Sequence, residues 1–389
     1  MKFFFMGKAF LFSFVIIAVL EFPVCGSDSV SVNKTKKQPK FQKQISFIME
    51  QGPMLPKNTE WGQQVGSTID FSAIDLRLGF RNTQPKLYNV IYKYPTYGFG
   101  YFRTTFKNDF IGKPNAVYMF GELPIGRTFV DNRLSFSIYM AFGLAFNFKP
   151  WDAEDNPLNQ FIGSYNNGYV HVASTVTYRV NEWVSLDGSL GLKHFSNGSF
   201  QKPNSGLNFI PFSIGIRTNL HKWYPEQNTK PEIPAFIRNN QVNIWGTVGG
   251  KNYLPGSERY VKYALGVNFL RQAGYKFRYG LGMDLFYAPG GSMDPNWQKD
   301  AFWDKASLAF VLSGELVLKP NLFIPLGIGV YAHRNPANDE PNWYYERIGV
   351  KYRFSNKLFT AITLKAHAFK ADIFELQMGY SIFKDRNKY

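Results

Sequence analysis

Apolar residues alternate with polar or small residues over long segments of this chain. Segment 275–287 has an aromatic or aliphatic side chain at every second position, with Lys276, Arg278, Asp284 and glycines between them. Because side chains of a β-strand point alternately to opposite faces, this period of two predicts strands with one apolar and one polar face. The stripe has aromatic residues at both ends and aliphatic residues within, which is typical of a strand whose apolar face meets lipid.

About sixteen such segments follow one another from residue 45 onward, an even number, as bacterial outer-membrane barrels require. The first four are less regular and are expected near 45–52, 68–80, 86–105 and 115–125. Short turns are expected at 180–182, 272–274, 319–321 and 355–357. All of these fall on one side of the predicted sheet, and the long loops fall on the other. We therefore expect an all-β fold, a transmembrane antiparallel up-and-down β-barrel.

The connection 221–234 contains three prolines and is long on the side where the other connections are short. It divides eight strands in residues 45–220 from eight in residues 235–389. A single closed barrel of about sixteen strands is the favoured expectation, because two barrels would each need separate closure within one chain. The alternative is an eight-stranded barrel joined to a second set of strands.

The N-terminus has the pattern of an export signal. Lys2 and Lys8 form a positive region before a twelve-residue apolar stretch at 9–20, and small residues around 24–27 offer a cleavage site. The alternatives are a membrane anchor, for which the stretch is short, and a lipoprotein acylated on Cys25. We expect a signal peptide over 1–26 and a flexible polar lead-in over 27–44. Cys25 is the only cysteine, so no disulfide is expected in the mature chain.

Composition and charge agree with export to a membrane. Aromatic residues make up 18% of the chain, and glycine occurs 34 times. The formal charge of +16 predicts either an anionic partner or a solvated basic surface without one. An exported barrel rarely meets nucleic acid, so the phosphorylated head groups of lipids are the expected partner.

Candidate chemistry lies at the end of one apolar stripe. The apolar face of 184–192 continues into His194 and Ser196, and the apolar face of the next strand begins at Asn208. All three polar groups are expected on the lipid-facing wall, beside the long loop 197–206. A serine hydroxyl becomes a good nucleophile when a base takes its proton, and imidazole is suited to this near neutral pH. The pair predicts an esterase that acts on a lipid, and the alternative is a polar pair decorating the membrane interface.

Other residue patterns are weaker. Asn197 and Asn204 in the long loop, or backbone amides beside them, could donate hydrogen bonds to an oxyanion. No phosphate-binding loop of the Gly-Lys-Ser/Thr type and no Gly-x-Ser-x-Gly motif occurs, and no cofactor is expected. A metal site is not expected, because carboxylates and cysteines do not cluster with His171, His333 and His367. A cation site or, more simply, a solvated acidic loop is expected at Asp152, Glu154 and Asp155.

The run His194-Phe195-Ser196-Asn197, followed by Lys202-Pro203-Asn204 and Gly206-Leu207-Asn208, closely resembles the outer-membrane lipid A 3-O-deacylase family. This family is also called PagL-type or acyloxyacyl hydrolase. Its small eight-stranded barrel carries a His–Ser–Glu triad on the membrane-facing wall and removes an ester-linked acyl chain from lipid A. The resemblance is specific over 190–216 and extends over 130–220, so the later eight strands are additional to the family's barrel.

The resemblance implies that His194 is the general base, that Ser196 is the nucleophile and that Asn204 is the asparagine on the oxyanion side. At Asn208 the chain departs from the family, whose third member is Glu. The expected function is therefore an outer-membrane lipid A deacylase that acts on lipopolysaccharide in the outer leaflet without a cofactor. The alternatives are a channel or transporter with a water-filled lumen and a catalytically silent homologue. The sequence does not indicate the oligomeric state.

Overall fold

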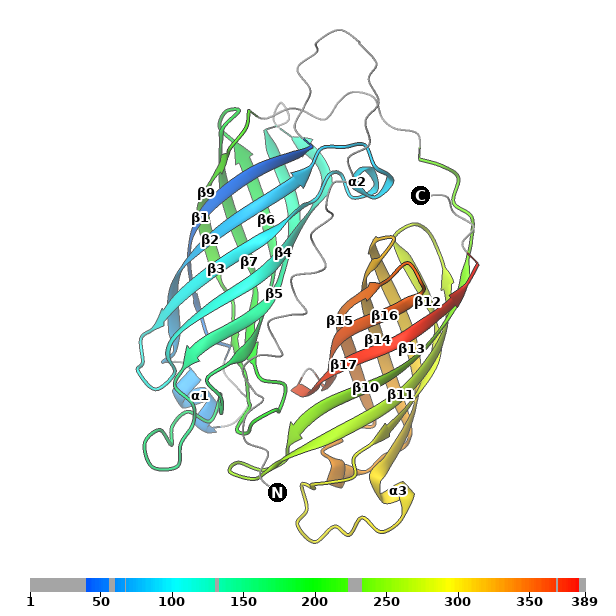
Figure 1. Cartoon of the computed structure of the whole chain (residues 1–389). Helices are drawn as coiled ribbons and strands as arrows, with labels where there is room; N and C mark the ends of the chain where they lie inside the picture. The colour runs from blue at the N-terminus through cyan, green and yellow to red at the C-terminus, as the bar shows by residue number, and fades with distance from the viewer. Residues whose placement is uncertain are drawn as a thin grey trace. The chain divides into compact units, whose positions relative to one another are not determined.

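The computed structural model describes residues 40–55, 60–66, 68–129, 133–222, 233–368 and 370–384. These residues belong to a single compact unit of the chain, and nearly all regular structure in them is antiparallel β-sheet (Figure 1). The predicted signal peptide, most of the predicted lead-in and most of the 221–234 connection lie outside the described residues. Among the described residues, none of the helices has the length and apolar character needed to span a bilayer.

The N-terminal strands close into one barrel. They are β1 (Phe41–Pro53), β2 (Asp70–Asn82), β3 (Thr96–Phe106), β4 (Gly112–Phe129), β5 (Leu134–Phe148), β6 (Asn167–Arg179), β7 (Val184–Ser196), β8 (Leu207–Phe209) and β9 (Phe212–Asn219). Each strand from β1 to β7 pairs with the next, and β9 pairs with both β7 and β1. The short β8 pairs with the end of β7, so β8 and β9 together occupy one position in an eight-stranded wall.

The C-terminal strands close into a second eight-stranded barrel. They are β10 (Asn240–Asn252), β11 (Arg259–Gln272), β12 (Phe277–Tyr287), β13 (Ala306–Lys319), β14 (Leu322–His333), β15 (Tyr344–Arg353), β16 (Leu358–His367) and β17 (Lys370–Phe383). Neighbours in the chain are neighbours in the sheet, and β17 returns to pair with β10. Two short helical elements lie in the long loops, α3 (Phe302–Lys305) and η1 (Pro336–Asn338).

The structure confirms the all-β, antiparallel up-and-down barrel, but the expectation of a single sixteen-stranded barrel was wrong. Two barrels form because β9 finds its partner in β1, with Phe47 opposite Ile216, and β10 finds its partner in β17. Each set of eight strands thus satisfies its own edge hydrogen bonds, which removes the need to share one wall. The first strand begins at Phe41, within the segment expected to be a polar lead-in.

The expected strand over 86–105 was also partly wrong. Residues Leu87–Ile91 form a helix, α2, and β3 begins only at Thr96. Pro95 separates the two elements, because proline offers no N–H to a neighbouring strand and restricts the residue before it. Tyr88 and Tyr92 lie one helical turn apart, and both are buried. A second helix, α1 (Glu60–Gly66), lies in the loop between β1 and β2.

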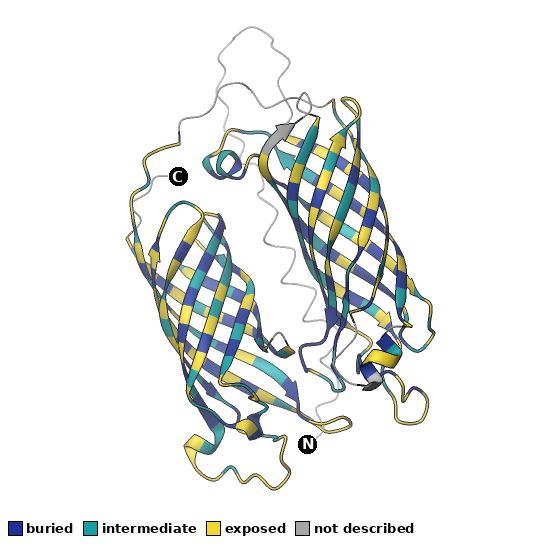
Figure 2. Ribbon diagram, turned by 180° about the vertical axis from the view of Figure 1, so that it is seen from behind, coloured by how far each residue is buried: buried dark blue, intermediate teal, exposed yellow. Residues whose placement is uncertain are grey.

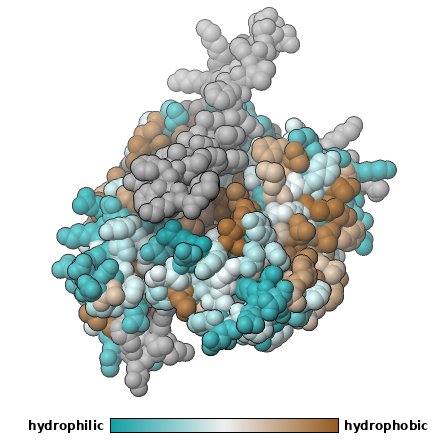
Figure 3. Space-filling model, turned by 60° about the horizontal axis from the view of Figure 1, so that its bottom comes forward, coloured by the Kyte–Doolittle hydropathy of each residue, from teal (hydrophilic) through white to brown (hydrophobic). Residues whose placement is uncertain are grey.

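Buried and exposed residues alternate along the strands of both barrels (Figure 2). On β12, Phe277, Tyr279 and Leu281 are exposed, whereas Arg278 and Asp284 are buried. The apolar stripes therefore form the outer walls, as predicted, and the polar stripes face the interior. In the view of Figure 3, hydrophilic and hydrophobic side chains form separate groups on the visible face.

Candidate active site

The end of β7 places His194 and Ser196 on the outer face of the N-terminal barrel. They continue the outward stripe of Leu190 and Leu192, whose side chains are exposed. His194 lies opposite Asn208 on β8, so the two side chains point to the same face of the sheet. The structure therefore brings together all three residues that the sequence singled out.

Hydrogen bonds join the three side chains in series. The His194 Nδ1 atom lies 2.7 Å from Asn208 Oδ1, and His194 Nε2 lies 2.8 Å from Ser196 Oγ. A carbonyl oxygen only accepts, so Nδ1 carries the proton and donates it to Asn208. In neutral imidazole this leaves Nε2 as the acceptor for the Ser196 hydroxyl. The imidazole is thus in the tautomer that a general base requires.

The inward residues of β7 fix this end of the strand from the other side. Lys193 is buried and forms an ion pair with Glu50, and its ammonium lies 3.8 Å from the centre of the Phe102 ring. Phe195 is also buried and packs among the aromatic rings of Phe102, Phe148, Tyr169 and Phe209. Packing of this kind restricts the backbone from which His194 and Ser196 project.

The loop 197–206 is folded against the site. Gly206 adopts a positive φ of 71°, and a Cβ atom there would lie 2.9 Å from His194 Cε1. Glycine therefore allows both the left-handed backbone and the close approach to the imidazole. Gly206 belongs to the run Gly206-Leu207-Asn208 that resembles the deacylase family, but no role was expected for it from the sequence.

The two asparagines proposed for the oxyanion side differ in their contacts. Asn197 donates from Nδ2 to Ser164 Oγ and to the Gln201 carbonyl, at 2.8 Å each, so its amide is used in holding the loop. Asn204 accepts from the Asn197 backbone N–H at 3.1 Å, while its own Nδ2 is buried without a hydrogen-bond partner among the described residues. Asn204 is therefore the one of the two that retains an uncommitted side-chain donor.

The other candidate residues do not join this site. His171 is buried between the rings of Tyr139 and Tyr169. Asp152 accepts hydrogen bonds from the backbone N–H groups of Glu154 and Asp155, and these bonds lower the pKa of its carboxyl. The acidic loop therefore folds on itself. Within the described ranges, no group of three or more His, Cys, Asp or Glu side chains is arranged to hold a metal ion.

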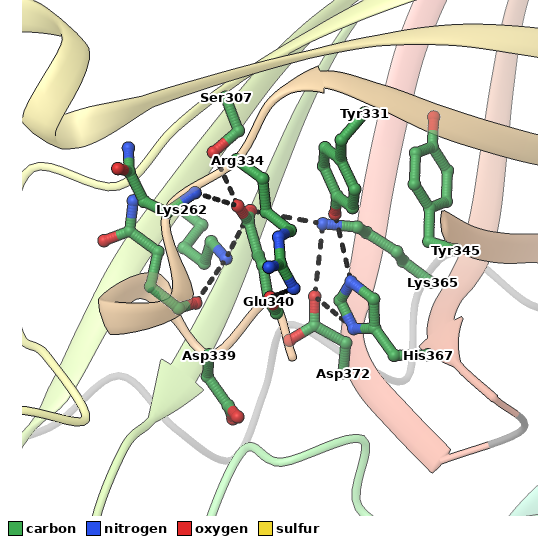
Figure 4. A network of polar contacts seen from close by, with 12 residues as sticks. Lys262, Ser307, Tyr331, Arg334, Asp339, Glu340, Tyr345, Lys365, His367 and Asp372 are labelled. Atoms are coloured by element: carbon green, nitrogen blue, oxygen red, sulfur yellow. Dashed lines mark hydrogen bonds and ion pairs between the residues drawn. The ribbon is translucent and has the colours of Figure 1, made fainter. Parts of the chain in front are cut away.

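A separate polar cluster fills the C-terminal barrel near its long loops (Figure 4). Glu340 lies 3.7 Å from the Lys262 ammonium and 3.6 Å from that of Lys365, and it accepts a hydrogen bond from Ser307. Asp372 lies 3.3 Å from Lys365 and also pairs with Lys251. The side chains of this cluster are almost fully buried, which fixes the loop that carries Glu340 inside the barrel mouth.

Comparison with known protein families gives two matches. Residues 77–217 match the family "Lipid A 3-O-deacylase (PagL)", and residues 240–385 match "Acyloxyacyl hydrolase, C-terminal domain". The first match contains the candidate site, and the second covers all eight strands of the C-terminal barrel. A search of curated proteins gives no significant match.

Among solved structures, the siderophore receptor PirA from Pseudomonas aeruginosa aligns with 89% of this chain and 81% of its own, at 10% identity and a TM-score of 0.23. An outer membrane channel from Pseudomonas putida F1 aligns with 92% of this chain and 100% of its own, at 14% identity and a TM-score of 0.20.

Proposed function

This chain belongs to the PagL-type lipid A 3-O-deacylase family, and we propose that it hydrolyses an ester-linked acyl chain of lipid A by a serine mechanism on its lipid-facing wall. The observation that carries the proposal is the hydrogen-bonded series Asn208–His194–Ser196 on the outer face of the barrel. Ser196 has the place of a nucleophile, His194 that of its base, and Asn208 that of the group that orients the base.

In the proposed reaction, His194 Nε2 takes the proton of the Ser196 hydroxyl while Oγ attacks the ester carbonyl carbon. The carbonyl oxygen becomes an oxyanion, and the buried Nδ2 of Asn204 is the proposed donor to it. Collapse of this intermediate breaks the ester C–O bond, and the imidazolium returns the proton to the departing sugar alkoxide. Water then attacks the acyl-serine with the same base, which releases the fatty acid and restores the Ser196 hydroxyl.

Asn208 takes the place of the family's glutamate in this scheme. Its carbonyl oxygen holds the Nδ1 proton and so keeps the productive tautomer, but it brings no negative charge to stabilise the imidazolium. We therefore propose an active but slow enzyme. The charge deficit matters more at a lipid-facing site than in water, because a low dielectric strengthens electrostatic interactions.

The proposed substrate reaches the site from the outer leaflet. The three side chains lie where β7 and β8 meet a long loop, which in outer-membrane barrels faces the cell exterior. Lipid A is anchored in that leaflet, so its acyl chains run beside the exposed apolar wall of Leu190 and Leu192. The positive net charge of the chain complements the phosphorylated head group of such a lipid.

The alternative of a wide channel has less support. It assumed a lumen enclosed by sixteen strands, whereas each barrel here has eight, a size whose interior side chains can fill. Three basic side chains of the barrel interiors form ion pairs there: Lys193 with Glu50, Arg278 with Glu315, and Arg347 with Glu375.

Mass spectrometry of lipid A from membranes with and without the protein tests the proposed function. We expect loss of one ester-linked acyl chain with the wild-type protein, and no loss with Ser196→Ala or His194→Ala. Because the two residues act as a unit, the double variant should be little worse than either single one. Wild-type turnover by a folded Ser196→Ala barrel would remove the proposal, and turnover by neither form would favour a silent homologue.

A further inference from the structure

A phenylalanine of the C-terminal barrel lies beside the candidate nucleophile of the N-terminal barrel. Phe374 projects from β17, and a Cβ atom added to Gly168 would lie 3.1 Å from its ring carbon Cζ. A Cβ atom added to Gly198 would collide with the same ring. Gly168 is the cross-strand partner of Ser196, and Gly198 follows Ser196 by two residues. Phe374 therefore covers glycines on both sides of Ser196.

The ring lies on the same face of the sheet as the Ser196 side chain. Residues directly opposite each other in an antiparallel pair point their Cβ atoms to the same side. Since Gly168 is opposite Ser196, the direction in which its Cβ would meet Phe374 is also the outward direction of Ser196. Ser196 is only 2% exposed. The Phe374 ring therefore lies on the side of the sheet toward which the Ser196 side chain points.

The loop that follows Ser196 is also bound to the C-terminal barrel. Ser199 Oγ donates to the Ala371 carbonyl at 3.0 Å, and the Asn252 N–H donates to the Ser199 carbonyl at 2.9 Å. The Lys202 backbone N–H donates to Asn252 Oδ1 at 3.1 Å, and the Lys202 ammonium lies 3.2 Å from Asp339. These bonds come from β10, β17 and the loop beside the buried cluster of Figure 4. They hold the ring and the loop in one arrangement.

We propose that the C-terminal barrel supplies one wall of the acyl-binding site, and that Phe374 determines which acyl chains Ser196 accepts. This inference rests on the proposed function. Phe374 lies next to the nucleophile, so it meets the part of the chain closest to the ester carbonyl. It therefore selects against substituents on the first carbons of the acyl chain, and removing the ring makes room for them.

The test compares two p-nitrophenyl esters in mixed detergent micelles, the dodecanoate and its 2-methyl derivative, using the full chain. We expect Phe374→Ala to raise the ratio of kcat/KM for the branched over the linear ester by about tenfold, the size of effect that one methyl group has in an apolar pocket. Phe374→Trp should lower the ratio. Leu376→Ala is the matched control, because Leu376 is exposed on the outer face of the same strand two residues away, and it should leave the ratio unchanged.

The outcomes separate this inference from the proposed function. An unchanged ratio in Phe374→Ala, with turnover that still requires Ser196, contradicts the proposed role of Phe374 and is compatible with the proposed esterase function. Turnover that survives Ser196→Ala overturns both.

A second measurement tests the wall without using activity. In a Cys25→Ser background, the pair Gly168→Cys and Phe374→Cys should be joined by a short bis-methanethiosulfonate reagent in membranes. The pair Gly168→Cys and Met378→Cys should not be joined, because four residues along a strand span about 13 Å. Failure of the first pair to cross-link overturns the proposed wall.

Discussion

At the residue scale, the candidate site depends on an imidazole that spans positions i and i+2, which are neighbours on the same face of a strand. Residues i and i+2 rise about 6.6 Å along a strand, too far for a direct hydrogen bond between backbone-proximal atoms. The ring of His194 covers that distance and places Nε2 at 2.8 Å from Ser196 Oγ. The ring also points its Nδ1 toward the neighbouring strand, where Asn208 Oδ1 accepts a hydrogen bond from it. A strand end can therefore carry the whole series on one face.

Replacing Asn208 by a carboxylate should increase the rate. In serine hydrolases, exchange of the acid for its amide lowers kcat by about 10⁴, because the amide brings no charge and can hold the wrong tautomer. In this chain the amide holds the productive tautomer, so we expect a smaller gain, about tenfold to a hundredfold, from Asn208→Glu. Single-turnover deacylation of purified lipid A by the two forms measures it. Asn208→Ala is the control and should be slower than wild type. A Glu variant no faster than wild type would mean that the site is adapted to an amide.

At the element scale, a period of two determines the face of a residue but not the partner of its strand. The sequence was sufficient to assign Phe277 to the outer wall and Arg278 to the interior, because only local alternation is needed. It was not sufficient to pair β9 with β1, since that contact joins residues far apart in the chain. Phe374 could not have been recognised as part of the site for the same reason. The prolines at 221–234 were the available signal for two barrels.

The assignment of faces can be checked with two adjacent residues of β13. Leu312 is 60% exposed, whereas Ser313 is 7% exposed. We expect Leu312→Cys to react with a maleimide that partitions into lipid and to be protected from a charged one, because its side chain is exposed on the apolar outer wall. Ser313→Cys should react with neither, since the interior around it is packed. Labelling of Ser313→Cys by the charged reagent would indicate a water-filled lumen.

The conformation of the loop that follows Ser196 should depend on the ion pair between Lys202 and Asp339. Lys202→Met and Asp339→Asn should each lower kcat. The double variant should be little worse than Asp339→Asn alone, because Asp339→Asn already removes the ion pair with Lys202 as well as the one with Lys251. Burial opposes ionisation of Asp339, but Lys251 and Lys202 outweigh it and hold the pKa of this carboxyl below its ordinary value. The Asp339 carboxylate therefore contributes fully above its ordinary pKa and is lost only as pH falls through the lowered one. The effect of Asp339→Asn on kcat should accordingly be constant between pH 5 and pH 8, and kcat measured across that range checks it. Additive effects of the two variants would contradict the pairing.

At the scale of the whole molecule, the described residues place paired charges and aromatic rings in the interiors of both barrels. In the N-terminal barrel, Arg217 bridges Glu122 and Asp187 at 2.9 Å each. In the C-terminal barrel, the Glu315 carboxylate forms ion pairs with Arg278 at 2.9 Å and with Lys351 at 2.7 Å. A buried charge without its partner is strongly destabilising, so these pairs hold the side chains across the interior. This packing agrees with the proposal that the lipid substrate binds on an outer wall.

The protein reconstituted in planar bilayers should therefore show no sustained conductance of the kind given by a sixteen-stranded porin, which serves as the positive control. Eight strands enclose an interior that side chains can fill, and here the ions would have to displace buried pairs such as Arg347–Glu375. The same preparation should release fatty acid from lipid A, which shows that the protein is folded and correctly inserted. Steady porin-like currents that persist in Ser196→Ala would mean that a barrel opens in the membrane, and the channel would then replace the deacylase as the better account of the molecule. Turnover without conductance would support the proposed site on the outer wall, where β7 and β8 carry Ser196, His194 and Asn208.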